Sequence, residues 1–260
     1  MKPKTLEGAL LLLASSAALA QGADPLATRP GLEIGAQLAQ YRYEEPSIPV
    51  TIDGIRAGFV GAYTFTSENR MFFRIDGRAS YGSLSYQGSG SADGVPDFIF
   101  EVRGVAGMDF NPGGIGVSPY AGLGYRYLFD DLTGYSSTGA AGYRRYSNYF
   151  YAPIGVTLRF GANSGWVFAP TLEYDLFIQG KQKSMLSDAN AGLNDVTNTQ
   201  KSGYGYRAYL MFEKNHLTIG PYLHYWNISD SDKQPIAPGV LGLEPANWTR
   251  EIGFELRYRF

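Results

Sequence analysis

The chain has 260 residues, of which 44% are hydrophobic and only 18% are charged, with 33 glycines, 20 tyrosines, 15 phenylalanines and no cysteine. This balance excludes a disordered chain, a coiled coil and a collagen, and it favours an all-β fold in which strands hold the aromatic rings and turns hold the glycines. With no cysteine and only His216 and His224, the sequence offers no disulfide and no histidine-rich metal site, so we expect neither a metal nor a cofactor. A net charge of -2 gives no reason to expect nucleic acid as a partner.

Residues 1–20 are predicted to be a secretory signal peptide. Lys2 and Lys4 precede an apolar run over 9–19, and Ala18-Leu19-Ala20 supplies small residues before Gln21. The run is shorter than the roughly 20 residues that a helix needs to span a bilayer. Residues 21–30 are then a periplasmic lead-in, and 31–260 form one domain without a long apolar stretch. If that domain lies in a membrane it must be a closed β-barrel, because only helices and barrels satisfy every backbone group in lipid.

Alternation of apolar and polar residues predicts ten strands in this domain. They cover residues 32–43, 54–65, 70–86, 97–110, 116–129, 146–160, 165–179, 203–213, 216–228 and 248–260. Most have at least the 9–11 or so residues of a tilted membrane-spanning strand, whereas strands of soluble proteins usually have about 5–6. Eight strands are the alternative, because the first two runs are the least regular and Gln40 and Arg42 interrupt the first.

The connections between these strands alternate between short and long. The short ones cover 66–69, 111–115, 161–164 and 214–215, and the long polar ones cover 44–53, 87–96, 130–145, 180–202 and 229–247. A β-sandwich has no reason to keep such a rule, but an outer-membrane barrel has tight periplasmic turns and long extracellular loops. The sequence therefore predicts a single antiparallel up-and-down transmembrane barrel with both termini on the periplasmic side.

The last predicted strand carries the clearest family signal. Every second residue from Ile252 to Phe260 is apolar or aromatic, and the intervening positions hold Glu251, Gly253, Glu255, Arg257 and Arg259. A chain that ends on such a strand resembles the small outer-membrane β-barrels of Gram-negative bacteria, the porin-like and opacity-like class. The resemblance implies location in the outer membrane, with Tyr258 and Phe260 read as a signal by the barrel assembly machinery.

Placing the apolar faces against lipid leaves a charged set that faces the lumen. The members that we expect to form a charge network are Arg74, Asp76, Arg78, Glu101, Arg103, Arg126, Glu173, Asp175, Arg207, Glu251, Glu255 and Arg257. The same parity also contains Glu33, Arg56, Asp109, Arg159, Glu213 and Arg259. Charges of both signs in a narrow lumen should pair, because an isolated buried charge costs several kcal/mol or more. We expect these pairs to hold the barrel shut, and a narrow channel for polar solutes is the alternative.

A catalytic site in such a barrel would lie at the predicted extracellular mouth. Ten strands is also the strand count of the omptin proteases, and that resemblance would imply an Asp pair opposite an Asp-x-His pair, but the chain has no Asp-x-His. His224 points inward by parity near the predicted mouth and is followed by Asp230 and Asp232. A water-activating site built on His224 is conceivable. We expect instead a lumen histidine that is hydrogen-bonded to neighbouring tyrosines or carboxylates.

The predicted loops remain as carriers of function. Residues 132–146 mix Gly, Ser, Thr and Tyr, and residues 181–201 mix Asn, Asp, Lys and Thr. Tyr, Ser, Gly and Asn are adaptable recognition residues. Arg144, Arg145, Lys181 and Lys183 could pair with phosphates of lipopolysaccharide. The sequence thus predicts a non-enzymatic outer-membrane barrel, structural or weakly porin-like, in contact with lipid and lipopolysaccharide. The alternatives are a surface-recognition or adhesin protein with an unidentified loop ligand, and a hydrolase that uses His224.

Overall fold

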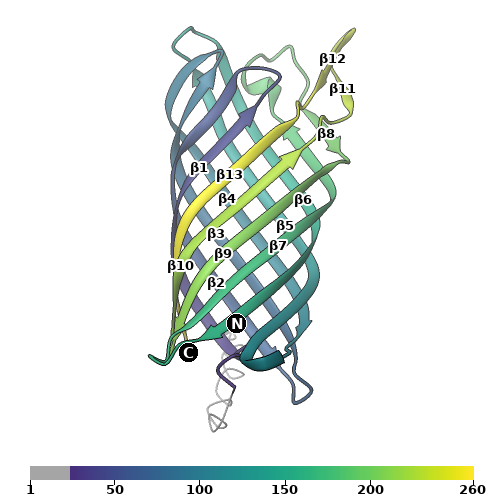
Figure 1. Cartoon of the computed structure of the whole chain (residues 1–260). Helices are drawn as coiled ribbons and strands as arrows, with labels where there is room; N and C mark the ends of the chain where they lie inside the picture. Colours follow the sequence, from purple (N-terminus) through teal and green to yellow (C-terminus); the bar gives the residue numbers. More distant parts are fainter. Residues whose placement is uncertain (1–23) are drawn as a thin grey trace, which may run out of the picture.

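The computed structural model describes residues 24–260 and shows a closed antiparallel barrel of ten strands (Figure 1). They are β1 Gly31–Glu45, β2 Val50–Thr66, β3 Met71–Gly88, β4 Gly90–Met108, β5 Ile115–Tyr135, β6 Ala141–Gly161, β7 Val167–Ser184, β9 Gly203–Lys214, β10 Leu217–Ile228 and β13 Asn247–Arg259. Each strand pairs with the next, and β13 pairs with β1 to close the ring. The predicted signal peptide lies outside the described residues.

The prediction of ten strands is confirmed, and the eight-strand alternative is wrong. β1 and β2 pair without interruption from Gly31 opposite Thr64 to Glu45 opposite Val50. Gln40 and Arg42 lie on the outer face of β1, where Arg42 stands over the ring of Trp248. Polar residues appear there because this end of β1 lies at the membrane interface, beside Trp248 of β13, rather than at the centre of the apolar band.

Short elements that the sequence did not predict cover the end of the barrel opposite the termini. β8 Val196–Gln200 extends the sheet beside β7, and β11 Lys233–Ala237 forms a hairpin with β12 Val240–Leu243. The 3-10 turn η2 Leu186–Asp188 lies at this end too, whereas η1 Pro112–Gly114 connects β4 to β5 at the end of the barrel that holds the termini. Within residues 24–260 no helix is long and apolar enough to span a membrane.

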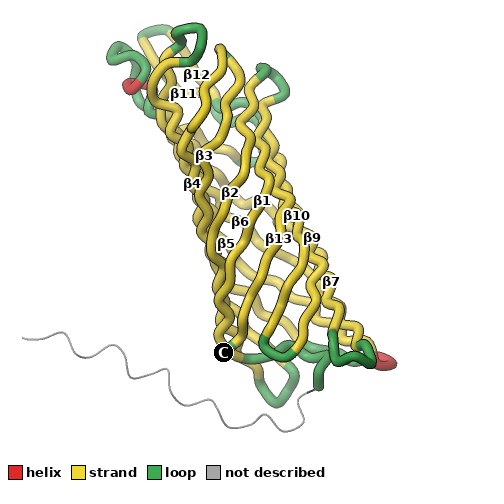
Figure 2. The backbone as a smooth tube through the Cα atoms, turned by 90° about the vertical axis from the view of Figure 1, so that its left-hand side faces the viewer, coloured by secondary structure: helices red, strands yellow, loops and turns green. Residues whose placement is uncertain are grey.

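The two ends of the barrel differ, as Figures 1 and 2 show. β1 begins and β13 ends at the end where consecutive strands are joined by tight turns, whereas hairpin extensions and loops project from the other end. Because outer-membrane barrels place their short turns in the periplasm, the first end is periplasmic and the second is extracellular.

The outer face of the barrel is a band of exposed apolar side chains, among them Phe59, Leu123 and Leu172, each at least 66% exposed. Two groups of aromatic residues in contact flank this band. The periplasmic group contains Tyr63, Phe65, Phe73, Phe160, Phe168, Phe212, Tyr258 and Phe260, and the extracellular group contains Phe98, Tyr127, Phe129, Tyr146, Tyr174, Tyr204, Tyr206, Tyr225 and Trp248. An apolar band between aromatic girdles is the lipid-facing surface of a membrane barrel.

Several strands run farther toward the extracellular end than the sequence predicts. The predicted loop 130–145 is mostly strand, because β5 and β6 stay paired as far as Tyr135 opposite Ala141. The predicted loop 87–96 likewise belongs largely to β3 and β4, which pair to Gly88 opposite Gly90. Beyond the membrane both faces of a strand meet water or polar loops, so the apolar alternation that revealed the strands disappears while the backbone pairing continues.

Candidate functional site

The interior of the barrel contains a layered network of ion pairs. At its centre Arg207 of β9 donates to Glu101 of β4, with Nη1 3.0 Å from Oε2, and to Asp175 of β7, with Nε 2.7 Å from Oδ2. Arg78 of β3 donates to the same Glu101 at 2.6 Å and reaches Glu251 of β13 at 2.8 Å. The contacts of Arg207 with Glu101 and of Arg78 with Glu251 join strands that are not neighbours in the ring, so these two cross the lumen, whereas Arg78–Glu101 and Arg207–Asp175 join paired strands.

The next layer toward the periplasm is built on Arg103 of β4. Its guanidinium donates to Asp76 at 2.9 Å and to Glu173 of β7 at 2.5 Å. The hydroxyl of Tyr120 on β5 donates to the second oxygen of Glu173 at 2.7 Å. Arg207 also lies 3.1 Å from Glu173, which connects this layer to the central one.

Near the periplasmic end, Glu33 forms ion pairs with three arginines. Arg74 donates to it at 2.7 Å, Arg257 lies 3.6 Å away, and Arg259 donates to its other oxygen. Arg257 also pairs with Glu255 on the same strand. Eleven of the twelve predicted network residues thus form ion pairs.

Arg126 is the exception among the predicted network residues. It is fully buried, yet its only hydrogen bond within residues 24–260 is a long one of 3.4 Å to the hydroxyl of Thr249. Its guanidinium instead lies 5.5 Å from the ring of Tyr149 and 5.6 Å from that of Trp226. The inward direction was predicted correctly, but the partners are aromatic faces, which attract a cation through the quadrupole of the ring.

Toward the extracellular end the network continues through Arg56, which was predicted to face the lumen but not to join the network, and through Asp97. Arg56 pairs with Asp97, lies 3.8 Å from Glu251 and stacks over the ring of Tyr41 at 3.3 Å. Asp97 stands directly opposite Asp130 across β4 and β5. Asp130 was missed because it lies in a segment predicted to be a loop. Asp97 was overlooked at the first position of the predicted strand 97–110, although it shares the lumen-facing parity of Glu101.

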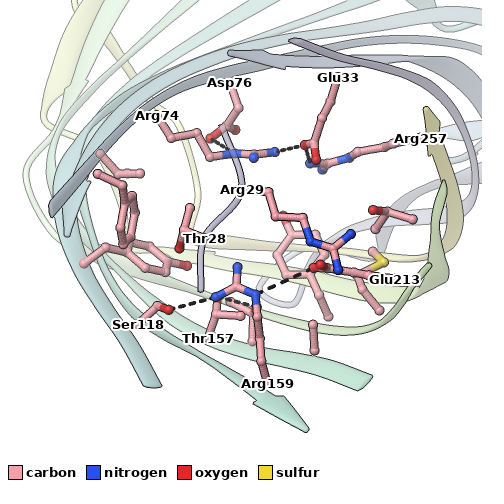
Figure 3. Close-up of a pocket in the computed structure, with 18 of the residues that line it drawn as sticks. Thr28, Arg29, Glu33, Arg74, Asp76, Ser118, Thr157, Arg159, Glu213 and Arg257 are labelled. Carbon is pink, nitrogen blue, oxygen red and sulfur yellow. Dashed lines mark hydrogen bonds and ion pairs between the residues drawn. The ribbon is translucent and has the colours of Figure 1, made fainter. Parts of the chain in front are cut away.

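A cavity of about 130 Å³ lies at the periplasmic end of the network, and the segment before β1 enters it (Figure 3). Thr28 donates from its backbone N and from its hydroxyl to Asp109, at 2.9 and 2.8 Å. Arg29 donates to the backbone oxygen of Asn215. Figure 3 shows Arg159 across the cavity from Arg74 and Glu33; it is bound to Ser118 at 2.8 Å and lies 3.9 Å from Glu213.

The same segment is fastened to the rim of the barrel. A Cβ on Gly116 would lie 2.1 Å from the backbone oxygen of Leu26, so this close approach requires glycine. Asp24 accepts hydrogen bonds from the backbone N–H of Leu26 and the amide of Asn111, and both lower the pKa of Asp24. Residues 24–30 of the predicted lead-in therefore close part of the periplasmic opening.

At the extracellular end a second cavity, of about 760 Å³, lies among the first three hairpin connections. Arg145 is at its base, buried with Glu45 at 3.0 Å and in contact with Glu244 of the last loop. The hydroxyl of Tyr43 donates to Glu45 at 2.5 Å. Arg145 was expected to meet lipopolysaccharide, and this expectation is wrong, because the side chain turns inward to these carboxylates.

His224 lies inside the barrel rather than at its mouth. It is 3% exposed, stands opposite Arg207 and Glu251 in the sheet, and its Nε2 is 2.7 Å from the hydroxyl of Tyr209. Parity predicted the inward direction, whereas the depth was misjudged: β10 ends at Ile228, where the predicted strand also ends, and His224 lies four residues before that end. His216 lies in a periplasmic turn, where its Nδ1 is 2.7 Å from the backbone oxygen of Arg259.

The aspartates that follow β10 shape the loop instead. Asp230 accepts the backbone N–H of Ala246, and Asp232 accepts that of Thr199. Both hydrogen bonds hold the last loop against its surroundings. Neither Asp230 nor Asp232 is hydrogen-bonded to His224.

Compared with known protein families and with curated protein sequences, the chain matches none. Among solved structures, the outer-membrane protease OmpT of Escherichia coli aligns with a TM-score of 0.57 at 8% identity, over 91% of this chain and 100% of that one. Neisserial surface protein A aligns with a TM-score of 0.39 at 12% identity, over 88% of this chain and 97% of that one. Ail, the attachment invasion locus protein of Yersinia pestis, aligns with a TM-score of 0.33 at 11% identity, over 89% and 100%.

These likenesses concern the fold. The alignment with OmpT over the whole barrel agrees with the lipid-facing band and its aromatic girdles. The predicted class and location are confirmed: the chain is a closed β-barrel of the outer membrane.

Proposed function

We propose that this protein is a non-conducting outer-membrane barrel that acts by recognition at the cell surface through the extracellular end of the barrel. The observation that carries the proposal is the charge network, in which Arg207 and Glu101 join opposite walls while Arg78 and Glu251 fill the space beside them. All four side chains are at most 8% exposed. A hydrated pore needs lumen-facing groups that bind water, and here these groups bind one another.

The energetics favour a closed lumen at rest. Separating one of these pairs would leave a charge buried without its partner, which costs about 3–5 kcal/mol in proteins. A path for solutes must separate several pairs at once, since the layers share Glu101, Glu173 and Glu251. The structural role that the network supplies is therefore rigidity of the barrel.

The extracellular end offers what recognition requires. It carries the large cavity, a projecting hairpin, β11 and β12, and exposed polar loops, all supported by a rigid scaffold. Exposed Lys181 and Lys183 on the outer face of β7 suit the phosphates of lipopolysaccharide, which we propose as a structural partner. His224 has no catalytic step in this function, and its Nε2 is hydrogen-bonded to the hydroxyl of Tyr209.

The test is the single-channel conductance of the refolded protein in a planar bilayer, with heat modifiability on a gel to show that the barrel has folded. We expect no steady conductance from the folded protein. Steady, ion-selective conductance would overturn the proposal and favour the weak porin instead. A variant with Arg78, Glu101 and Arg207 all replaced by alanine serves as the positive control, because once folded it should conduct.

A further inference from the structure

The extracellular cavity has the size and lining of a small-molecule site. Its volume of about 760 Å³ falls within the roughly 300–1,000 Å³ typical of ligand pockets. Three connections build it: the β1–β2 turn, the end of the β3–β4 hairpin and the end of the β5–β6 hairpin. Because these hairpins stay paired well beyond the membrane, their walls are strands rather than loose loops.

Apolar and aromatic side chains line much of the cavity. Val50, Tyr86 and Leu132 line it and pack against a buried cluster under the wall that includes Tyr41 and Ile52. Ile48, Val95, Tyr135 and Tyr143 add further apolar surface and two more rings. A ligand in this space would contact hydrocarbon and the faces of tyrosines.

The charges on the lining are unequal. Three carboxylates, Glu45, Asp93 and Asp131, face one cation, Arg145. Arg145 is already engaged with Glu45 and Glu244 and lies 5.2 Å from the ring of Tyr43. The cavity therefore has an excess of negative charge.

Asp93 and Asp131 are held in place by hydroxyl and backbone donors rather than by ion pairs. Asp93 accepts the hydroxyl of Ser85 at 2.8 Å, and Asp131 accepts the backbone N–H and hydroxyl of Thr133 at 3.1 and 2.6 Å. Neither carboxylate forms an ion pair with any residue of 24–260. Both are therefore free to attract a positive group from outside the chain.

We propose that this cavity binds an organic cation, an amine or quaternary ammonium group carried on an apolar or aromatic body. The carboxylates and the tyrosine faces attract the cationic group, and the aliphatic walls bury the body. The inference rests on the proposed function, since it names the chemical class that the extracellular end recognises.

Three probes that share one phenyl ring test the inference. The amine 2-phenylethylamine, the neutral 2-phenylethanol and the anion phenylacetate are titrated into the full protein folded in nanodiscs of zwitterionic lipid, with isothermal titration calorimetry as the readout. We expect the amine to bind severalfold more tightly than the alcohol, and the anion to bind most weakly. Equal affinity for the three probes, or a preference for the anion at Arg145, would overturn the inference.

Substitutions of the lining carboxylates test whether the amine binds in this cavity. Asp93→Asn and Asp131→Asn should each weaken binding of the amine by about threefold to fivefold and leave binding of the alcohol unchanged. Asp53→Asn is the matched control, because Asp53 lies at the same end of the barrel on the outer face of β2 and does not line the cavity. An equal loss in all three variants would show a general field effect and would contradict a specific site.

The two proposals can fail separately. A conducting barrel whose amine binding depends on Asp93 and Asp131 would overturn the proposed non-conducting state and keep the cavity as a binding site. A non-conducting barrel in which these variants bind the amine as the parent does would overturn the cavity site alone. Heat modifiability verifies that each variant is folded before its affinity is measured.

Discussion

Arg207 on β9 and Glu101 on β4 meet inside the barrel although β5, β6 and β7 separate their strands on the shorter path around the ring. Their contact is supported from both sides, since Tyr151 donates to Glu101 at 2.5 Å and Asp175 accepts from Arg207 at 2.7 Å. The pair fastens opposite walls, so removing it should affect the whole barrel rather than one hairpin.

Arg207→Met should lower the free energy of unfolding by about 3–5 kcal/mol, because Glu101 and Asp175 keep their buried charges and lose a partner. Urea unfolding from lipid vesicles, followed by tryptophan fluorescence, measures the loss. Arg126→Met is the matched control: it removes the same buried side chain, but only ring contacts and one long hydrogen bond, and should cost about 1 kcal/mol. Equal losses in the two variants would contradict a stabilising role for the ion pairs.

The sequence predicts the structure well in the part of the barrel that faces lipid and poorly beyond it. Alternation reveals strands and lumen-facing charges wherever lipid imposes an apolar outer face, as along the strands that carry Arg103 and Glu173. It fails beyond the lipid, where Arg145 and Glu244 belong to the interior of extended hairpins and loops that carry no such pattern. Parity also does not identify the contacts of a side chain. It predicts that Arg126 points inward but not that its neighbours are aromatic rings.

Glycines inside the barrel make room for tyrosine rings. A Cβ on Gly124 would lie 2.3 Å from the ring of Tyr151, which is fully buried and held by its bond to Glu101. Gly124→Ala should therefore destabilise the barrel by about 1–3 kcal/mol through overpacking. The same urea titration checks it, with Gly61→Ala as a control that should cost much less, because its nearest neighbouring atom would be 3.7 Å away. A tolerated Gly124→Ala would show that Tyr151 can move.

The segment before β1 should be held chiefly by Asp109. This carboxylate accepts the backbone N–H and the hydroxyl of Thr28, so Asp109→Ala removes both hydrogen bonds. Since the chain has no cysteine, a cysteine introduced at Ala27 gives a single maleimide-reactive site. We expect its labelling rate to rise about tenfold or more with Asp109→Ala and to stay unchanged with Glu68→Gln in a neighbouring periplasmic turn. An unchanged rate with Asp109→Ala would mean that the rim contacts of Leu26 hold the segment alone.

The last extracellular loop should loosen as the pH rises through neutrality. Burial, with the nearby charge of Glu45, raises the pKa of Glu244 to about 7 although Arg145 opposes the shift. The other groups that face it are Tyr43 and Tyr143, which carry no charge at this pH. In the folded protein Glu244 thus keeps its proton in a range where it would already be ionised in an unfolded loop.

The sign follows from linkage: a carboxyl whose pKa is raised by folding contributes stability at acidic pH and loses it as the pH rises from about 4.5, its usual value, to about 7. Hydrogen–deuterium exchange over 238–246, corrected for intrinsic exchange, should therefore show local opening to be about tenfold or more frequent at pH 8 than at pH 5. Glu244→Gln removes the titration and should show the same opening at both values. If Glu244→Gln keeps the pH dependence, another group controls this loop, and exchange that slows at pH 8 would mean that the ion pair with Arg145 outweighs the cost of burying the charge.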